Sequence, residues 1–316
     1  MLKWVLNLFS AAPIGGFSTG RRIVKDHRIK LDSFNKIADT PLNRSTALRS
    51  ATLFSRQDSS CLGSTGVRTR FIALVLGVLF ALSVPPALAN CNAAPQPGIN
   101  WLGCDKQEAD LQNANLERAL LNRTSFQGAN LRGANLQRAD FGNARLNGAT
   151  LDETNLQGTR FVAANLSEVS IQEADARGIR LDRATLTNAN LSNSRLDEAR
   201  FYASNALNAK LRNSTLAEAV FTQADFRDSD FSKATLRRID ARRAQMEGAN
   251  FAGADLSDAD LQNARLTNAD FSGANLRGAD LRSADISGAD FTDAELSNAI
   301  WTDRRRCRRG SVGSCD

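Results

Sequence analysis

The chain contains few of the residues that carry most enzyme chemistry. Among 316 residues there are one histidine (His27), one tyrosine and two methionines. With a single histidine, a Ser-His-Asp or Cys-His triad and a multi-histidine zinc site are nearly excluded. No GxSxG, HExxH, GxxxxGK[ST] or GxGxxG motif opens a helix. Acidic groups such as Asp225, Asp228 and Asp230 are interpreted as turn formers on a solvated surface. The sequence therefore predicts a non-catalytic protein without a cofactor or a metal.

Positive charge is concentrated at the two ends of the sequence. The chain has 40 Lys and Arg against 34 Asp and Glu, a formal charge of +6, and an isoelectric point near 9.4. Residues 1–104 contribute +8, residues 105–301 contribute −5 and residues 302–316 contribute +3. A basic protein ordinarily suggests an anionic partner. Without residues 1–89 the charge is near −2, so no nucleic-acid partner is expected.

A short apolar run near residue 75 predicts export. Residues 71–83 are apolar, follow Arg68 and Arg70, and precede an Ala-Leu-Ala sequence that ends at Ala89. A basic flank, an apolar stretch and a small-residue end are the three parts of a secretory signal peptide. The run is too short to span a bilayer comfortably. We expect residues 67–89 to be a signal peptide and the mature protein to lie in the periplasm or outside the cell, without stable membrane insertion.

The segment before this run leaves alternatives open. Residues 1–66 are a mis-annotated N-terminus if translation starts at Val67. Alternatively, their arginines, serines and few acids form a first targeting signal of a bipartite leader, and the mature protein then lies in a thylakoid lumen. A genuine N-terminal module is the third alternative. N-terminal sequencing of the mature protein decides whether processing occurs after Ala89.

A strict five-residue period dominates the remainder. From Leu111 to Trp301 every fifth residue is large and apolar, except for Ala176, Ala206 and Ala241, and two residues before each lies mostly Ala, Ser or Thr. On an α-helix such residues would spiral around the axis, and in one continuous strand they would alternate between faces. A short extended step followed by a turn places both residues inward. Glycine and asparagine at the remaining positions suit that turn.

A second period of 20 residues indicates four units per coil. Phe231, Phe251, Phe271 and Phe291 have this spacing and should stack on one side of the interior. With coils separated by about 4.8 Å, some ten coils form a rod of roughly 47 Å. Such a solenoid is stabilised by contacts between neighbouring coils and has an exposed edge at each end.

The units resemble the pentapeptide-repeat family. The sequences Ala-Asn-Leu-Arg-Gly at 129–133 and at 274–278 match its motif, and the resemblance covers about 195 of the 316 residues. It implies an all-β fold, a right-handed quadrilateral β-helix, which we assign to residues 109–301. Residues 90–108 are then an N-terminal cap and residues 302–316 a C-terminal cap or tail. The motif is specific for the fold and says almost nothing about function.

The three alanines in the apolar series predict local adjustments of packing. Near two of them the preceding small position holds Ile179 and Ile239, which we interpret as compensation for the lost volume. Beside the third, Leu207 is predicted to turn inward through a local bulge.

Four cysteines flank the solenoid. Cys61 lies in the leader, and the mature chain keeps Cys91, Cys104, Cys307 and Cys315. Thiols of exported proteins usually pair, and pairing between the two ends of the rod would exceed the reach of a disulfide. We therefore predict Cys91–Cys104 and Cys307–Cys315 disulfides that fasten end caps, each stabilising by about 2–3 kcal/mol in the chain-entropy model.

Arginines in the middle of the solenoid form a candidate interaction patch. Three of them occupy equivalent places in successive coils, where stacked like charges are unfavourable unless an anion or carboxylates neutralise them. One interpretation is docking of an anion or a partner. The other, which we favour, is local pairing with Asp182, Asp197, Glu198 and Glu218. The patch comprises Arg160, Arg180, Arg200 and Tyr202, followed by Arg237, Arg238, Arg242 and Arg243.

These features predict an exported solenoid that acts as an interaction or structural scaffold, with a protein as its partner. The alternative follows from the family resemblance, since some pentapeptide-repeat proteins mimic DNA and bind a topoisomerase in the cytoplasm. The mixed charge of the repeat and the export signal disfavour that alternative. Cell fractionation distinguishes the two.

Overall fold

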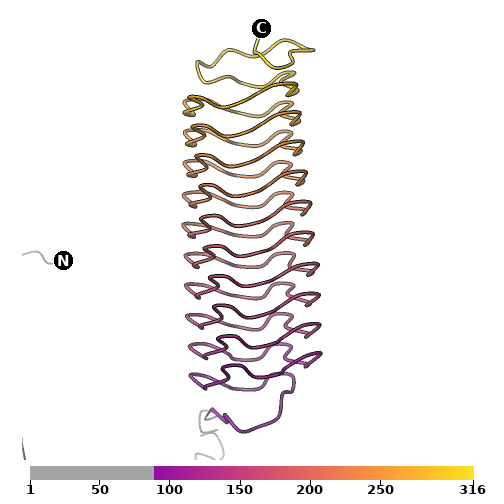
Figure 1. Cartoon of the computed structure of the whole chain (residues 1–316), viewed down its shortest axis with the longest axis vertical. Helices are drawn as coiled ribbons and strands as arrows, with labels where there is room; N and C mark the ends of the chain where they lie inside the picture. The colour runs from indigo at the N-terminus through magenta and orange to yellow at the C-terminus, as the bar shows by residue number, and fades with distance from the viewer. Residues whose placement is uncertain (1–88) are drawn as a thin grey trace, which may run out of the picture. The chain divides into compact units, whose positions relative to one another are not determined.

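The computed structural model describes residues 89–316. The predicted targeting segment 1–66 and residues 67–88 of the predicted signal peptide lie outside the described residues. The described chain winds into a regular stack of coils, with the N-terminal residues at one end and the C-terminal residues at the other (Figure 1).

The stack is held together by single-residue bridges spaced by 20 residues. Within residues 89–316 there is no helix and no continuous strand, and each unit contributes one β-bridge residue. The bridges are parallel and run without interruption from Asn100↔Leu120 to Asp280↔Ile300, with four in every 20 residues. This register gives ten coils with four sides each. The predicted right-handed quadrilateral β-helix is confirmed.

Residues 129–134 show how the sequence forms one side of a coil. Ala129 and Leu131 are fully buried, and Asn130 between them forms the bridge. The Asn130 N–H donates to the preceding coil at 3.0 Å, and the Leu131 N–H donates to the following coil at 2.7 Å. The Ala134 N–H donates to the Leu131 carbonyl at 3.0 Å and closes the turn. Gly133, the third residue of the turn, has φ of 68°, as in a type II turn.

Every turn repeats this backbone conformation. From Gly98 to Asn298 every fifth residue has a positive φ, and most of these residues are not glycine. Even Ala163 and Ala203 adopt it, with φ of 55° and 52°. A left-handed conformation costs an alanine about 1 kcal/mol or more. The inter-coil hydrogen bonds on both sides of each turn hold the residue there.

The inward residues form one continuous core. The four phenylalanines spaced by 20 residues stack as predicted, with ring centroids 5.0, 4.9 and 5.0 Å apart and planes within 6° of parallel. Ile179 and Ile239 are buried, with 0% and 1% of their surface exposed, so both point inward as the predicted volume compensation requires.

The predicted bulge at Leu207 is wrong. Asn205 bridges both neighbouring coils in the regular register, and Leu207 is a half-buried turn residue. A bulge would disrupt the ladder on both sides of the coil. The space at Ala206 is filled instead by aromatic rings, since Phe226 occupies the same place in the next coil and lies 5.4 Å from the Phe201 ring.

The first coil begins earlier than the sequence suggested. The ladder starts at Asn100, inside the segment 90–108 that was assigned to a cap. Trp101 and Cys104 occupy the inward places of the repeat and are 0% and 2% exposed, although neither matches the Leu and Ala of the motif. Cys104 is also bonded to Cys91, with Cα atoms 5.4 Å apart. The disulfide therefore ties the N-terminal residues to the first coil.

The C-terminal residues fold back on the last coil. Two antiparallel bridges, Glu295↔Val312 and Ile300↔Arg306, join the tail to it. The predicted disulfide between Cys307 and Cys315 is present, with Cα atoms 4.8 Å apart. The tail thus satisfies part of the backbone edge that the solenoid would otherwise expose (Figure 1).

Candidate functional site

The predicted arginine patch lies on one side of the solenoid. Bridges link Arg160 to Arg180, Arg180 to Arg200, Arg200 to Val220 and Val220 to Asp240. The turns on either side of Asp240 carry the other four predicted arginines, at 237–238 and 242–243. We call this side, with the bridge column 160–240 and those flanking turns, the arginine face. The structure therefore brings the two predicted arginine groups onto one surface.

Two aspartates partly neutralise the arginine stack. Asp182 lies between two arginines, 3.4 Å from Arg180 Nε and 3.3 Å from Arg200 Nη2. Its side chain is only 9% exposed, whereas those of the arginines are about half exposed. Arg160 lies 3.6 Å from Asp140. Three guanidinium groups thus share two carboxylates, and the stack keeps one excess positive charge.

Of the other three carboxylates expected to pair with arginines of the patch, only Glu218 does so. Asp197 accepts hydrogen bonds from the hydroxyl of Thr215 at 2.8 Å and from the Ala217 N–H at 3.0 Å. Glu218 pairs with Arg238, and Glu198 forms no ion pair among residues 89–316. Local pairing within the patch is therefore confirmed for Asp182 and Glu218, and it is wrong for Asp197 and Glu198. The sequence reasoning missed Asp140, which lies one coil before Arg160 in the same column.

Tyr202 presents an aromatic ring beside the stack. It is 39% exposed and occupies the turn that follows Arg200, in the same column as Asp182. No ring or cation–π contact involves it within the described chain. Among residues 89–316, the other large hydrophobic side chains that are similarly exposed are those of Leu102, Leu120 and Val312.

The four arginines around Asp240 are mostly paired. Arg242 lies 2.6 Å from Asp240 and 3.6 Å from Asp260. Arg237 lies 3.3 Å from Asp255, and Arg238 pairs with Glu218. Arg243 has no ion-pair partner among the described residues. This part of the arginine face is a network of surface ion pairs, which individually stabilise by about 1 kcal/mol or less.

Arginines two residues after a bridge aspartate perturb its titration. A hydrogen bond from Arg177 lowers the pKa of Asp175, and hydrogen bonds from Arg227 and Arg242 likewise lower the pKa values of Asp225 and Asp240. These groups are ionised at neutral pH and act as acceptors. A general acid would instead require a raised pKa.

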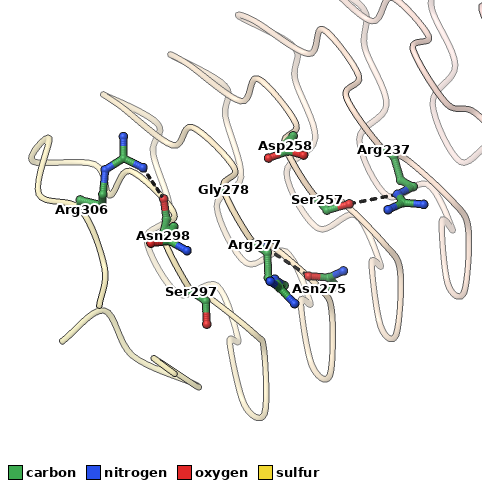
Figure 2. Close-up of a pocket in the computed structure, with 9 residues that line it drawn as sticks. All are labelled: Arg237, Ser257, Asp258, Asn275, Arg277, Gly278, Ser297, Asn298 and Arg306. Carbon is green, nitrogen blue, oxygen red and sulfur yellow. Dashed lines mark hydrogen bonds between the residues drawn. The ribbon is translucent and has the colours of Figure 1, made fainter. Parts of the chain in front are cut away.

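A hollow near the C-terminal end was not anticipated from the sequence. It has a volume of about 530 Å³, and Figure 2 shows the side chains around it. The residues that line it include Arg237, which the sequence had singled out, and Arg277 and Arg306, which it had not. Arg277 could have been found by following the turn residues at intervals of 20. Arg306 could not, because its place depends on how the tail folds back.

Residues 89–316 contain neither a metal-binding cluster nor a membrane-spanning helix. No group of three or more His, Cys, Asp or Glu side chains there could hold a metal ion. No helix in the same range is long and apolar enough to cross a membrane.

Comparison with protein families matches the repeat region throughout. Models described as pentapeptide repeats match residues 107–138, 129–167, 144–182, 231–275 and 259–298, and a model described as a pentapeptide repeat region matches residues 180–251. No curated protein matches the chain.

Several solved structures are similar. One is HetL from the cyanobacterium Nostoc sp. strain PCC 7120, a pentapeptide repeat protein involved in heterocyst differentiation regulation. It is 28% identical with a TM-score of 0.59, over 73% of this chain and 97% of HetL. Full-length QnrB1, a plasmid-mediated fluoroquinolone resistance protein, is 18% identical over 62% of this chain and 92% of its own, with a TM-score of 0.36. A pentapeptide repeat protein from the Arabidopsis thaliana thylakoid lumen is 28% identical over 34% of this chain and 69% of its own, with a TM-score of 0.22.

Proposed function

The chain belongs to the pentapeptide-repeat family, and we propose that it is an exported, non-catalytic scaffold that docks a protein partner on its arginine face. A rigid solenoid presents outward side chains at fixed intervals of one coil, which gives a partner a regular surface to recognise.

The observation that carries this proposal is the stack of three half-exposed arginines beside an exposed tyrosine. Arg180 donates a hydrogen bond to Asp182 from Nε at 3.4 Å, and its terminal nitrogens donate none within the described residues, so they remain available to a partner. Arginine and tyrosine are enriched among the residues that dominate binding energy in protein interfaces. Asp182 is nearly buried and contacts both Arg180 and Arg200, so it restrains both guanidinium groups, which are about half exposed.

Export is supported by two independent features. The basic, apolar and small-residue segments that end at Ala89 form the pattern of a signal peptide. The two disulfides, one at each end of the solenoid, are of the kind that persists in an oxidising compartment. Fractionation followed by N-terminal sequencing should find the protein outside the cytoplasm, beginning at Asn90. Unprocessed cytoplasmic protein would refute export.

The docking proposal is tested by affinity capture from the same compartment. The wild-type protein should retain a partner that the double variant Arg180→Gln, Tyr202→Ala loses. Arg145→Gln is a matched control, because Arg145 is an exposed bridge residue without an ion pair in the described chain and lies on another side of the coil. Equal capture by wild type and the double variant would place the docking surface elsewhere. Capture of a topoisomerase by cytoplasmic protein would favour DNA mimicry instead.

A further inference from the structure

One corner of the solenoid carries arginines in alternate coils. In the turns before the arginine face, the residues at 217, 237, 257, 277 and 297 are Ala, Arg, Ser, Arg and Ser. The small side chains leave space between the arginines, and this space is the hollow of about 530 Å³. A second hollow of about 290 Å³ shares Arg237 and Asp258 with it. The two hollows meet at these shared residues, and we call them together the corner groove.

Three guanidinium groups along the corner groove are only partly satisfied. Arg237 uses Nε for Asp255 at 3.3 Å and for the Ser257 hydroxyl at 3.2 Å. Arg277 uses Nε for Glu295 at 3.6 Å. Arg306 donates from Nη1 to the Asn298 carbonyl at 3.2 Å. The terminal nitrogens of Arg237 and Arg277, and Nη2 of Arg306, donate no hydrogen bond within the described residues.

The C-terminal tail brings the third arginine to the groove. Arg306 bridges Ile300, and the next residue, Cys307, is buried and disulfide-bonded. The Asn298 N–H donates to the Cys307 carbonyl at 3.2 Å. Arg306 is therefore attached to the last coil on both sides, and Figure 2 shows it beside Asn298, at the end of the stack beyond Arg277.

A glycine keeps the floor of the groove open. Gly278 has φ of +68°, and a Cβ atom there would overlap the Asp258 side chain. Asp258 is also the one carboxylate that lines the hollow. Asp258 belongs to the coil between those of Arg237 and Arg277. Because its carboxylate repels negative charge, an anionic ligand must place its charged groups beside the two arginines and an uncharged segment beside Asp258.

The spacing of the arginines selects a ligand. Arg237 and Arg277 are two coils apart, which is about 9.6 Å at the usual spacing of paired strands. A polyproline II helix has three residues per turn and rises about 3.1 Å per residue, so every third side chain recurs on one face at about 9.3 Å. On one face of a β-strand, successive side chains lie about 6.6 Å apart and every second one about 13 Å apart. Neither distance matches the spacing of the two arginines.

We propose that the corner groove binds an extended acidic peptide of a partner protein, in the polyproline II conformation, with carboxylates at every third residue. Each carboxylate would accept charge-assisted hydrogen bonds from the free terminal nitrogens of one arginine. This inference rests on the proposed docking function, because it names a segment by which a partner is held.

The test is fluorescence anisotropy with the purified full chain and a labelled peptide of four Glu-Pro-Pro repeats. Wild-type protein should bind it, and the Gln-Pro-Pro peptide should not bind. A peptide of the same composition with its four glutamates consecutive should bind about tenfold more weakly, because only its first and fourth carboxylates have the three-residue spacing and one of the three arginines is left without a partner. Equal binding of the spaced and consecutive peptides would overturn the proposed conformation.

Variants assign the binding to the groove. Arg277→Gln and Arg306→Gln should each weaken binding about tenfold, the usual effect of losing one charge-assisted hydrogen bond. Asp258→Asn should strengthen it, because a repulsive charge is removed. Arg145→Gln, with the same change of charge far from the groove, should leave it unchanged. If Arg145→Gln weakens binding as much as Arg277→Gln, the effect is general charge and the groove is not the site.

The two proposals fail separately. If Arg277→Gln and Arg306→Gln leave peptide binding intact while Arg180→Gln, Tyr202→Ala abolishes partner capture, the docking function stands and the groove inference is wrong. If peptide binding follows the predictions but no partner is captured, the groove is an acidic-peptide site and docking on the arginine face is refuted.

Discussion

The stacked phenylalanines allow a quantitative test of how the coils stabilise one another. Phe251 is fully buried and lies between two rings, 5.0 Å from Phe231 and 4.9 Å from Phe271, in nearly parallel planes. Phe161 is equally buried but stacks on one ring alone, that of Phe141 at 4.7 Å. The two sites therefore differ mainly in the number of ring contacts.

Replacement by leucine keeps most of the buried volume and removes these contacts. Each aromatic pair contributes about 0.5–1.5 kcal/mol beyond its buried area. Phe251→Leu should therefore lower the free energy of unfolding by about 1 kcal/mol more than Phe161→Leu does. Phe251→Ala also leaves a cavity, and we expect a loss of about 3–5 kcal/mol.

Equilibrium urea unfolding followed by circular dichroism measures these differences, and hydrogen exchange measured by mass spectrometry locates them. Because each coil contacts only its neighbours, the loss of protection for Phe251→Ala should be greatest in the coils on either side. If Phe161→Leu costs as much as Phe251→Leu, the second ring contact of Phe251 contributes nothing measurable. Uniform loss of protection along the chain would contradict coil-by-coil stabilisation.

Three further predictions follow from the ends, the bridge aspartates and the turns. Cys307→Ser with Cys315→Ser should destabilise the tail by about 2.5 kcal/mol, the chain-entropy value for so short a loop. Hydrogen exchange should then rise first in the last coil. Unchanged exchange there would refute a capping role. The pKa of Asp240 is lowered by its hydrogen bond from Arg242. The contribution of this carboxylate to the free energy of unfolding is therefore present above the unfolded pKa and is lost as pH falls through the lower folded value. Urea midpoints should be flat near neutrality and fall below about pH 4, and Asp240→Asn should reduce that fall. At Gly273 the backbone has a positive φ and an added Cβ meets no atom within 4 Å, so Gly273→Ala should lower the free energy of unfolding by about 1 kcal/mol. Gly278→Ala would also displace the Asp258 side chain and should lower it more. Equal thermal shifts for the two variants would show that displacing the aspartate costs nothing.

The interior of the solenoid could be predicted from the sequence because it follows a local rule. Each unit buries its fifth residue and the small residue two before it, as at Leu131 and Ala129, and this rule repeats regardless of distant residues. The Phe231 to Phe291 stack followed directly from the 20-residue spacing. The prediction at Leu207 was wrong because it considered one side chain and neglected the ladder, whose hydrogen bonds would be lost on both sides of the coil.

The outer surface was predicted in part. The sequence placed Arg160, Arg180 and Arg200 in one column, and their bridges confirm it. It did not identify Asp140 as a partner of Arg160, and it expected Asp197 to pair with an arginine of the patch, whereas Asp197 accepts hydrogen bonds from Thr215 and Ala217. Side chains on adjacent coils can reach several neighbours, and the choice among them depends on rotamers that periodicity does not specify.

The sequence by itself determined the coil, its register, its inward residues and the pairing of its four terminal cysteines, because burial and chain length leave few alternatives at those positions. Only the tertiary structure decided which carboxylate lies between which arginines, where the first coil begins, and that Arg306 completes a groove with Arg277. These contacts join residues from different coils or from a non-repeating tail. Their energies depend on the three-dimensional arrangement of flexible charged side chains, and no five-residue pattern encodes that arrangement.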